Sequence, residues 1–360
     1  MRRPIQDIAA QPSREFIGLL GAAIVNSTEA TQWVIANEGY PMIDGIPILL
    51  ENPRVYLYRL SGFLEMQLEK LHHFCRYPPD RFWAEPQVVE LQKRLLAVRS
   101  LLREFYAIES QREADGTFLP SKYDSEANTD IYTRIAWGYR SCSKGEAERT
   151  FPDAGELYTR LATLIRLQLP RNGIFLDLGC GVGRAVFDAA QAAPKGLAIG
   201  LDLSFSKIAR ACAIVRGRSV IRYPVREQEG IVEAEIQGQG QLNTAFGIGD
   251  GAHMLLPDAS VDCVLLGLII GLVPDPETLL REVVRVLKPA GSVIIADPFD
   301  AFYDYDYPWD HRLTPTAVIK ALKRVVPEAT VEMAGPVSYE EHWAHSRTVS
   351  YDTILITAKT

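Results

Sequence analysis

The feature that most constrains the fold is a glycine-rich turn, FLDLGCGVGR, at residues 175–184. The apolar residues before Asp177 are typical of a buried strand, and a helix is expected directly after the glycines. Glycines at alternate positions remove Cβ atoms, so the backbone of this turn can approach a ligand closely. The amides at the start of the helix can then bind an anion or a carboxylate. A tight turn without any ligand has the same pattern.

From about residue 153 onward, short apolar runs alternate with helical segments. This alternation predicts an α/β fold with a doubly wound, mostly parallel, seven-stranded sheet. The strands are expected at 174–178, 197–201, 244–248, 261–266, 291–296, 330–334 and 351–358. The helices are expected at 154–168, 183–192, 204–216, 276–287 and 314–326. The last two strands indicate one antiparallel edge strand, and the long connection at 218–242 indicates an inserted hairpin.

Asp202 ends the second of these strands, in the sequence AIGLDLS. A carboxylate at this point can accept hydrogen bonds from both hydroxyl groups of a ribose. The alternative is an acidic residue at the N-terminus of the next helix, beside Ser204. Arg184 stands where a dinucleotide-binding fingerprint has its third glycine, so the spacing disfavours that kind of site.

Further motifs follow the turn in a fixed order. They are Asp202, Gly249-Asp250-Gly251, Leu256-Pro257, Val261-Asp262, Pro274-Asp275-Pro276 and Leu287-Lys288-Pro289 with Gly291. With these motifs, residues 153–300 resemble the class I S-adenosylmethionine-dependent methyltransferases, in particular the branch with small-molecule and quinone-methylating enzymes. The resemblance implies a Rossmann-like fold, S-adenosyl-L-methionine as the cofactor, and transfer of its methyl group.

The resemblance also implies a set of cofactor-binding residues. The set is Asp177, Gly179, Cys180, Gly181, Gly183, Asp202, Leu203, Asp250, Gly251, Ala252 and Gly267. Within it, the glycine-rich turn would follow the methionine portion of the cofactor by backbone, and Gly267 would lie under the same end. Asp202 would hold the ribose, with Leu203 against the adenine ring. Asp250 would accept a hydrogen bond from the adenine amine, and the two residues after it would contribute backbone.

The methyl-acceptor side departs from the family. Leu268-Ile269-Ile270-Gly271-Leu272 follows the fourth strand and offers no base there. The loop at 302–311 is rich in aromatic and acidic residues, and its rings could stack on a planar acceptor. Tyr303, Tyr305 and His311 of this loop are the candidate catalytic residues. The alternative is a surface loop with a few docked rings.

The first 150 residues of the chain have a different sequence pattern. GYPMIDGIPILLENP resembles the C-terminal half of the small Trm112-like domain, a zinc-ribbon-like fold, although the cysteine pairs of that domain are missing. We therefore expect a degenerate Trm112-like module at 1–52, a helical region and linker at 53–150 that could serve as a lid, and the methyltransferase domain at 151–360. Helices are expected from residue 54 to about 110, the second of them over 87–108.

Charge and cysteine content limit the partners. The formal net charge of −7 disfavours a protein held to nucleic acid by bulk charge, without excluding a local basic patch. The five cysteines form no CxxC motif and no zinc-binding spacing, so no metal is expected. The longest apolar run, 263–273, is shorter than the roughly 20 residues that span a bilayer, and no signal peptide is evident. We expect a cytoplasmic protein that does not act at a membrane.

The sequence leaves three kinds of function open. The favoured one is methyl transfer from S-adenosyl-L-methionine to an O, N or C nucleophile of a small molecule or peptide, in specialised metabolism, by a chain that could form a homodimer. The second is methylation of RNA or protein. The third is a cofactor-binding regulatory or scaffold protein without turnover.

Overall fold

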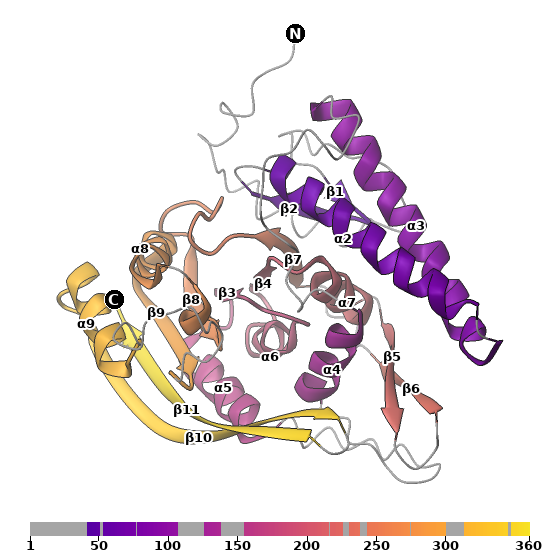
Figure 1. Cartoon of the computed structure of the whole chain (residues 1–360). Helices are drawn as coiled ribbons and strands as arrows, with labels where there is room; N and C mark the ends of the chain where they lie inside the picture. Colours follow the sequence, from indigo (N-terminus) through magenta and orange to yellow (C-terminus); the bar gives the residue numbers. More distant parts are fainter. Residues whose placement is uncertain are drawn as a thin grey trace.

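A nine-stranded sheet forms the centre of the computed structural model (Figure 1). The structure describes residues 42–50, 53–76, 78–106, 126–137, 155–215, 217–225, 230–237, 243–273, 275–299, 313–344 and 347–360. The strands of the sheet are β1 (Met42–Ile43), β2 (Ile46–Leu49), β3 (Ile174–Leu178), β4 (Leu197–Asp202), β7 (Thr244–Gly249), β8 (Val261–Gly267), β9 (Leu287–Asp297), β10 (Thr330–Ala344) and β11 (Arg347–Lys359). Their order across the sheet is β1-β2-β7-β4-β3-β8-β9-β11-β10.

The six strands from β2 to β9 in this order run parallel to one another. β11 is antiparallel to both of its neighbours, β9 and β10. One antiparallel strand was expected, but its expected position at the edge is wrong. β10 forms the edge, and the last strand of the chain inserts between β9 and β10, because β10 is joined to the sheet only through its hairpin with β11.

Helices cover both faces of the sheet, which confirms the doubly wound α/β prediction. α5 (Gly155–Gln168), α6 (Arg184–Ala192) and α7 (Phe205–Val215) lie on one face, and α8 (Pro276–Val286) and α9 (Pro315–Val325) lie on the other (Figure 1). The start of α8 is fixed locally, because Asp275 accepts hydrogen bonds from the amides of Glu277 and Thr278. Pro276 suits the first turn, where its missing N–H costs nothing.

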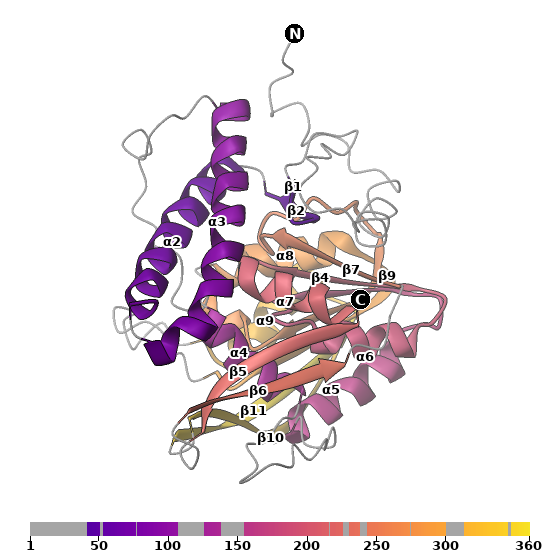
Figure 2. The ribbon, with the colours of Figure 1, turned by 90° about the vertical axis from the view of Figure 1, so that its right-hand side faces the viewer.

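The predicted insertion is a hairpin of β5 (Arg218–Val225) and β6 (Gly230–Gln237). The two strands pair antiparallel and form a separate sheet beside α4 and α7 (Figures 1 and 2).

The strands β1 and β2 extend the main sheet. β2 pairs parallel with β7, where Ile48 lies opposite Ile248. Asp44 and Gly45 form the turn before β2, with φ angles of 52° and 75°. The described strands before residue 52 are therefore part of the main sheet, and the Trm112-like module stays a prediction.

Three helices follow β2: α2 (Pro53–Phe74), α3 (Pro78–Tyr106) and α4 (Glu126–Trp137). α2 and α3 pack side by side as a helical hairpin (Figures 1 and 2). The expected start of the second helix at residue 87 is wrong, because α3 begins at Pro78 and contains Pro86. Proline is tolerated in the first turn of a helix, so Pro78 and Pro79 do not delay it. Within the region predicted as helical segment and linker, residues 126–130 form the first part of α4.

The basic side chains of α3 do not form one solvated face. Arg94 is buried, and its Nε lies 2.9 Å from a carboxylate oxygen of Asp44. Its guanidinium also lies 4.9 Å from the ring centroid of Phe205. Lys93 and Arg103 are exposed. Arg94 therefore connects α3 both to the β1–β2 turn and to the first residue of α7.

None of the described helices combines the length and the apolar character needed to cross a membrane. Of the cysteines in the described part of the chain, Cys180, Cys212 and Cys263 are buried and Cys75 is partly exposed, and all four are free thiols.

We predict that Arg94→Met lowers the free energy of unfolding by about 2 kcal/mol, measured by urea denaturation. Methionine keeps the packing over Phe205 but leaves the Asp44 carboxylate without its cation. The matched control is Arg103→Met on the exposed side of α3, which should change stability by less than about 0.5 kcal/mol. Equal effects of the two substitutions would contradict the proposed connection.

Candidate functional site

The glycine-rich turn after β3 is tied to the end of β4. The amides of Gly179 and Cys180 donate to the carbonyl of Leu201 at 2.8 and 3.1 Å. Gly179 and Gly183 have φ angles of 68° and 79°. A Cβ atom at Gly179 would collide with Ile269, and one at Gly183 would lie 2.7 Å from the ring of Phe246. The packing around the turn thus requires glycine at both positions.

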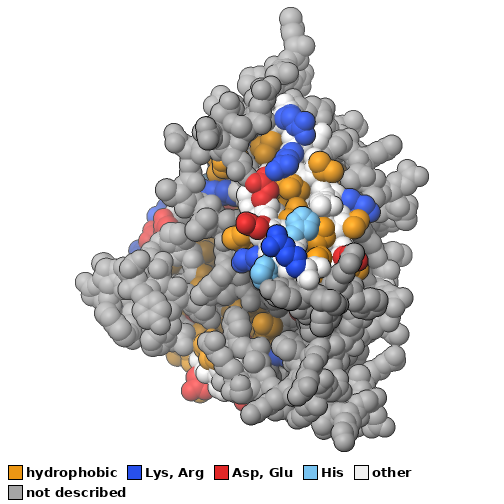
Figure 3. Space-filling view, turned by 45° about the vertical axis from the view of Figure 1, so that its right-hand side comes forward, with side chains coloured by type: hydrophobic (Ala, Val, Ile, Leu, Met, Phe, Trp, Pro, Cys, Tyr) orange, Lys and Arg blue, Asp and Glu red, His pale blue; other side chains and the backbone are white. Residues whose placement is uncertain are grey.

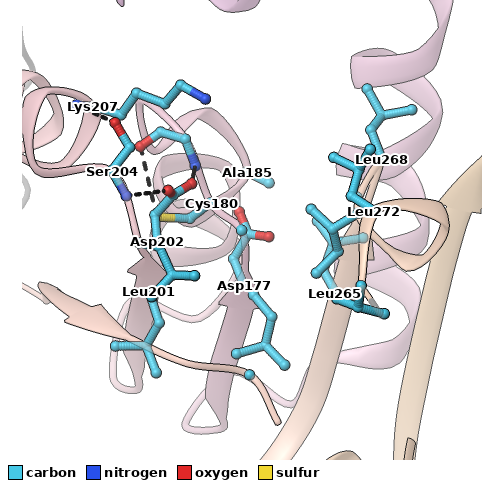
Figure 4. A pocket seen from close by; sticks show the side chains of 18 of the residues that line it. Asp177, Cys180, Ala185, Leu201, Asp202, Ser204, Lys207, Leu265, Leu268 and Leu272 are labelled. Carbon is cyan, nitrogen blue, oxygen red and sulfur yellow. Dashed lines mark hydrogen bonds between the residues drawn. The ribbon is translucent and has the colours of Figure 1, made fainter. Parts of the chain in front are cut away.

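Asp202 holds the turn from the neighbouring strand. One carboxylate oxygen accepts the amide of Gly181 at 2.8 Å, and the other accepts the amide of Ser204 at 2.8 Å. The helix cap is supplied by Ser204, whose hydroxyl accepts the amide of Lys207 at 3.3 Å. The carboxylate therefore reaches across to the turn, as Figure 4 shows, and does not cap α7.

These residues line a cavity of about 810 Å³ at the carboxyl ends of the parallel strands. Nine of the predicted cofactor-binding residues are among its lining: Asp177, Gly179, Cys180, Gly181, Asp202, Leu203, Asp250, Gly251 and Gly267. Gly183 and Ala252 are not in the lining. Gly183 packs against Phe246, and the amide of Ala252 donates to Asp250 at 2.9 Å. Gly183 and Ala252 therefore contact neighbouring residues of the site but do not line the cavity.

Asp177 is a buried carboxyl group of this cavity, with an exposed fraction of 4%. In Figure 4 its carboxylate points into the space between Asp202 and the apolar side chains of Leu268 and Leu272. Burial, and then the nearby negative charge of Asp202, raise the pKa of Asp177 well above its usual range. Perturbed carboxyl groups of this kind cluster at functional sites.

Asp250 lies in the turn after β7. Its second carboxylate oxygen is 3.3 Å from Nδ1 of His253, and both side chains are partly exposed. Leu203 is 52% exposed, an unusual value for a leucine that directly follows a buried strand. A planar apolar group could rest on this side chain.

The cavity continues into a region that the sequence analysis missed. Tyr158 of α5, Tyr339 and Glu341 of β10, Tyr351 of β11 and Asp297 of β9 all line it. A sequence signal existed for one of them, Tyr339. For Tyr339 the signal is the alternation of Val337 and Tyr339 with polar residues on β10, and in the structure Tyr339 and Glu341 are both buried on one face. Glu341 itself carried no signal, because Glu340 stands beside it.

α2 supplies another wall of the cavity, with Val55, Tyr56 and Arg59, three residues that the sequence analysis did not single out. The hydroxyl of Tyr56 donates to the carbonyl of Leu203 at 3.1 Å. The helical region therefore contributes directly to the site, next to the residue expected to contact adenine.

The candidate catalytic residues Tyr303, Tyr305 and His311 lie outside the described residues. The apolar segment after β8 is in the cavity wall, with Leu268, Ile269 and Leu272. Among the described residues, no group of three or more His, Cys, Asp and Glu side chains could hold a metal ion.

Residues 176–295 match the family described as "Methyltransferase domain". The chain is 32% identical over 133 residues to a demethylmenaquinone methyltransferase of Lactobacillus johnsonii, which covers 37% of this chain and 46% of that protein. It is 32% identical over 123 residues to an arsenite methyltransferase of Halobacterium salinarum, covering 34% and 26%. It is 30% identical over 137 residues to nocamycin O-methyltransferase of Saccharothrix syringae, covering 38% and 41%.

The chain thus spans less than half the length of these curated relatives. A solved structure of a SAM dependent methyltransferase from Aquifex aeolicus gives a TM-score of 0.36 at 17% identity, covering 56% of this chain and 97% of that chain. The matched segment contains the glycine-rich turn, Asp202 and Asp250. The chain carries a class I S-adenosylmethionine-dependent methyltransferase domain.

The residues present fit the cofactor of that family, S-adenosylmethionine. A Cβ atom at Gly181 would meet no atom within 4 Å, so the backbone there is open to a ligand. The carboxylates of Asp202 and Asp250 and the partly exposed Leu203 lie around the same cavity. Its apolar wall is formed by Leu268, Ile269 and Leu272. These groups suit the hydroxyl, amine and ring parts of a nucleoside and the charged end of methionine.

We predict that Asp177→Asn raises the melting temperature at alkaline pH. The pKa of this carboxyl is raised in the folded chain, so its stabilising contribution is complete below the unfolded value of about 3.9 and is lost as pH rises through the folded value. Asparagine cannot ionise, so the advantage of the variant should be largest at alkaline pH and disappear towards pH 4. Circular dichroism melts at a series of pH values would measure it.

The exposed Asp352 on β11 gives the control. Asp352→Asn should show no pH-dependent difference from the unmodified chain. A destabilising effect of Asp177→Asn at alkaline pH would contradict the account of a carboxyl group kept buried for function.

Proposed function

We propose that this protein transfers the methyl group of S-adenosyl-L-methionine to an O, N or C nucleophile of a small molecule or peptide. One observation carries the proposal. A single cavity runs from the glycine-rich turn and Asp202 to the tyrosines of α5, β10 and β11. A cofactor and an acceptor could lie next to each other in it, and methyl transfer requires that arrangement.

The cofactor would be held by the predicted residues. Asp202 would hold the ribose through the oxygen lone pairs that its bonds to Gly181 and Ser204 leave over. Leu203 would pack on the adenine ring, and Asp250 would accept the adenine amine. The turn at 179–183, with Asp177 and Gly267 beside it, would face the methionine end. Tyr56 and Val55 of α2 would cover the adenine side.

When bound, the cofactor supplies an electrophilic methyl group on a sulfonium cation. The chain then has to orient the two reactants and exclude water. Leu268, Ile269 and Leu272 form an apolar wall that serves the second purpose. Tyr303, Tyr305 and His311 remain our candidates for groups that contact the acceptor or accept its proton.

The names of the curated relatives support a small acceptor, since they include demethylmenaquinone, arsenite and nocamycin. We propose a role in specialised metabolism and a division into a module at 1–52, a helical region at 53–150 and a catalytic domain at 151–360, in which β1 and β2 of the first module join the main sheet. The contacts of α2 support a role for the helical region in closing the site.

One surface observation favours the alternative of an RNA substrate. Basic and histidine side chains gather on the face that α2 and α3 present (Figure 3). The exposed basic and histidine residues of α2, α3 and their connection include Lys70, His72, His73, Arg76 and Lys93.

We predict that the chain is not retained on immobilised RNA at about 0.15 M salt. α2 and α3 also carry exposed acidic residues, among them Glu69, Glu85 and Glu90, which weaken the positive field of these helices. Filter binding at several salt concentrations would measure retention. Tight retention with a steep salt dependence would support the RNA alternative.

We predict that Asp202→Ala weakens binding of S-adenosylhomocysteine by about 1–3 kcal/mol in isothermal titration. The substitution removes both a ribose acceptor and the bond that fixes Gly181. Asp352→Ala, at an exposed position on β11, removes the same charge away from the cavity and should leave affinity unchanged. Unchanged affinity of Asp202→Ala would remove the ribose assignment.

A further inference from the structure

Arg184 directly follows the glycine-rich turn. It is the first residue of α6, and it lines the cavity. The helix dipole disfavours a positive charge in the first turn of a helix, so α6 gains no stability from this charge. The arginine therefore needs another explanation than the stability of its own helix.

The guanidinium of Arg184 is held by three helices. Its Nε lies 3.1 Å from a carboxylate oxygen of Asp188 on α6, and its Nη1 donates to the carbonyl of Ala136 on α4 at 3.0 Å. The group also lies 5.5 Å from the ring centroid of Trp137 on α4 and 6.0 Å from that of Tyr158 on α5. These contacts fix its position, so a ligand that binds to it orders little additional structure.

One nitrogen of this guanidinium is left over. Nε and Nη1 have the partners just described, and an arginine carries two further donors on Nη2. Within the described part of the chain Nη2 makes no hydrogen bond, and it is not among the fully buried atoms that lack a partner. The side chain is 18% exposed. Nη2 is therefore accessible to a ligand.

Arg184 lies at the end of the cavity that holds Asp177. Burial raises the pKa of Tyr158, and among the neighbouring charges Arg184 lowers this pKa while Asp177 raises it. Both charges are thus close to the same hydroxyl group. The ion pair of Arg184 is with Asp188, so its charge is not spent on Asp177. In the proposed function this end of the cavity faces the methionine part of the cofactor.

The methionine part carries a carboxylate, and most of the cavity would repel it. The described lining has five carboxyl groups, which are Asp177, Asp202, Asp250, Asp297 and Glu341. A carboxylate placed among them needs a cation within hydrogen-bond distance. The arginine and lysine residues of the described lining are Arg59, Arg184 and Lys207.

The other two basic residues belong to different parts of the cavity. Arg59 lies on α2, three residues after Tyr56, which contacts the expected adenine side. Lys207 lies on α7, the helix that follows the expected ribose carboxylate, and its Nζ is 4.5 Å from the ring centroid of Tyr132. Arg184 is the basic residue that follows the glycine-rich turn itself.

We infer that Arg184 binds the methionine carboxylate of the cofactor through Nη2, while Asp188 and the ring of Trp137 hold the guanidinium in place. The inference rests on the proposed function, because it assigns a further binding residue to the same cavity. It gives the glycine-rich segment a charged contact in addition to its backbone contacts.

Two ligands that differ in one group test the inference: S-adenosylhomocysteine and its decarboxylated analogue. Their binding to the full chain would be measured by isothermal titration at one pH and salt concentration. We expect S-adenosylhomocysteine to bind at least tenfold more tightly. The analogue is the more positive ligand, and an acidic cavity favours it, so this preference requires a cation at the carboxylate. Equal binding, or tighter binding of the analogue, would overturn the inference.

Substitutions locate the preference. Arg184→Met should lower the affinity for S-adenosylhomocysteine about tenfold and that for the analogue less than twofold. Arg160→Met removes the same charge from an exposed position on α5 and should change neither. Lys207→Met should keep the preference for the carboxylate. A preference that survives Arg184→Met, or one that is lost only with Lys207→Met, would contradict the assignment.

A second variant guards against an effect on folding. Arg184→Gln removes the charge but can still donate a hydrogen bond to Asp188, so it should lose the preference as Arg184→Met does. Equal weakening of both ligands in the two variants would show a structural role of Arg184 and would overturn the inference.

The titration separates the two proposals. Failure of S-adenosylhomocysteine to bind to the unmodified chain would overturn the proposed function and, with it, the role of Arg184. Normal binding of S-adenosylhomocysteine without a preference for the carboxylate would count against Arg184 alone.

Discussion

The site depends on the carboxylate of Asp202, which bridges two backbone amides. It joins Gly181 in the turn after β3 to Ser204 at the start of α7. The same turn is fixed from the other side by the bonds of Gly179 and Cys180 to Leu201. The ends of two neighbouring parallel strands thereby become one rigid surface, open at Gly181 towards the cavity. Charge-assisted hydrogen bonds of this kind are stronger than neutral ones, so the geometry is set before any ligand binds.

The cavity around this surface draws on distant parts of the chain. β2 extends the sheet beside β7, and α2 follows directly and reaches Leu203 through Tyr56. At the opposite end, the β10–β11 hairpin brings Tyr339, Glu341 and Tyr351 to the cavity. The matched segment thus supplies the surface that we propose binds the cofactor, while elements before and after it supply much of the remaining wall.

The predictable part of the site is the part encoded locally. Asp177, the glycines and Asp202 follow strand ends within short segments, so their spacing indicated both the fold and the cofactor surface. The contact of Tyr56 with Leu203 joins residues far apart in sequence, and no local pattern encodes it. The position of β11 beside β9 is likewise decided by tertiary packing, because the local sequence allows either of the two last strands to form the edge of the sheet. Glu341 could not be told from its neighbour Glu340 in the sequence, because only the burial of the folded strand separates the two side chains.

The central claim is that one cavity brings cofactor and acceptor together for methyl transfer. Its most direct test is the transfer of radiolabelled methyl from S-adenosyl-L-methionine into a cell extract, followed by separation of the products by size. The account predicts label in the low-mass or peptide fraction that depends on the added chain and is lost with Asp202→Ala. Label only in RNA or protein would contradict the proposed acceptor class, and no label in any fraction would support a cofactor-binding protein without turnover.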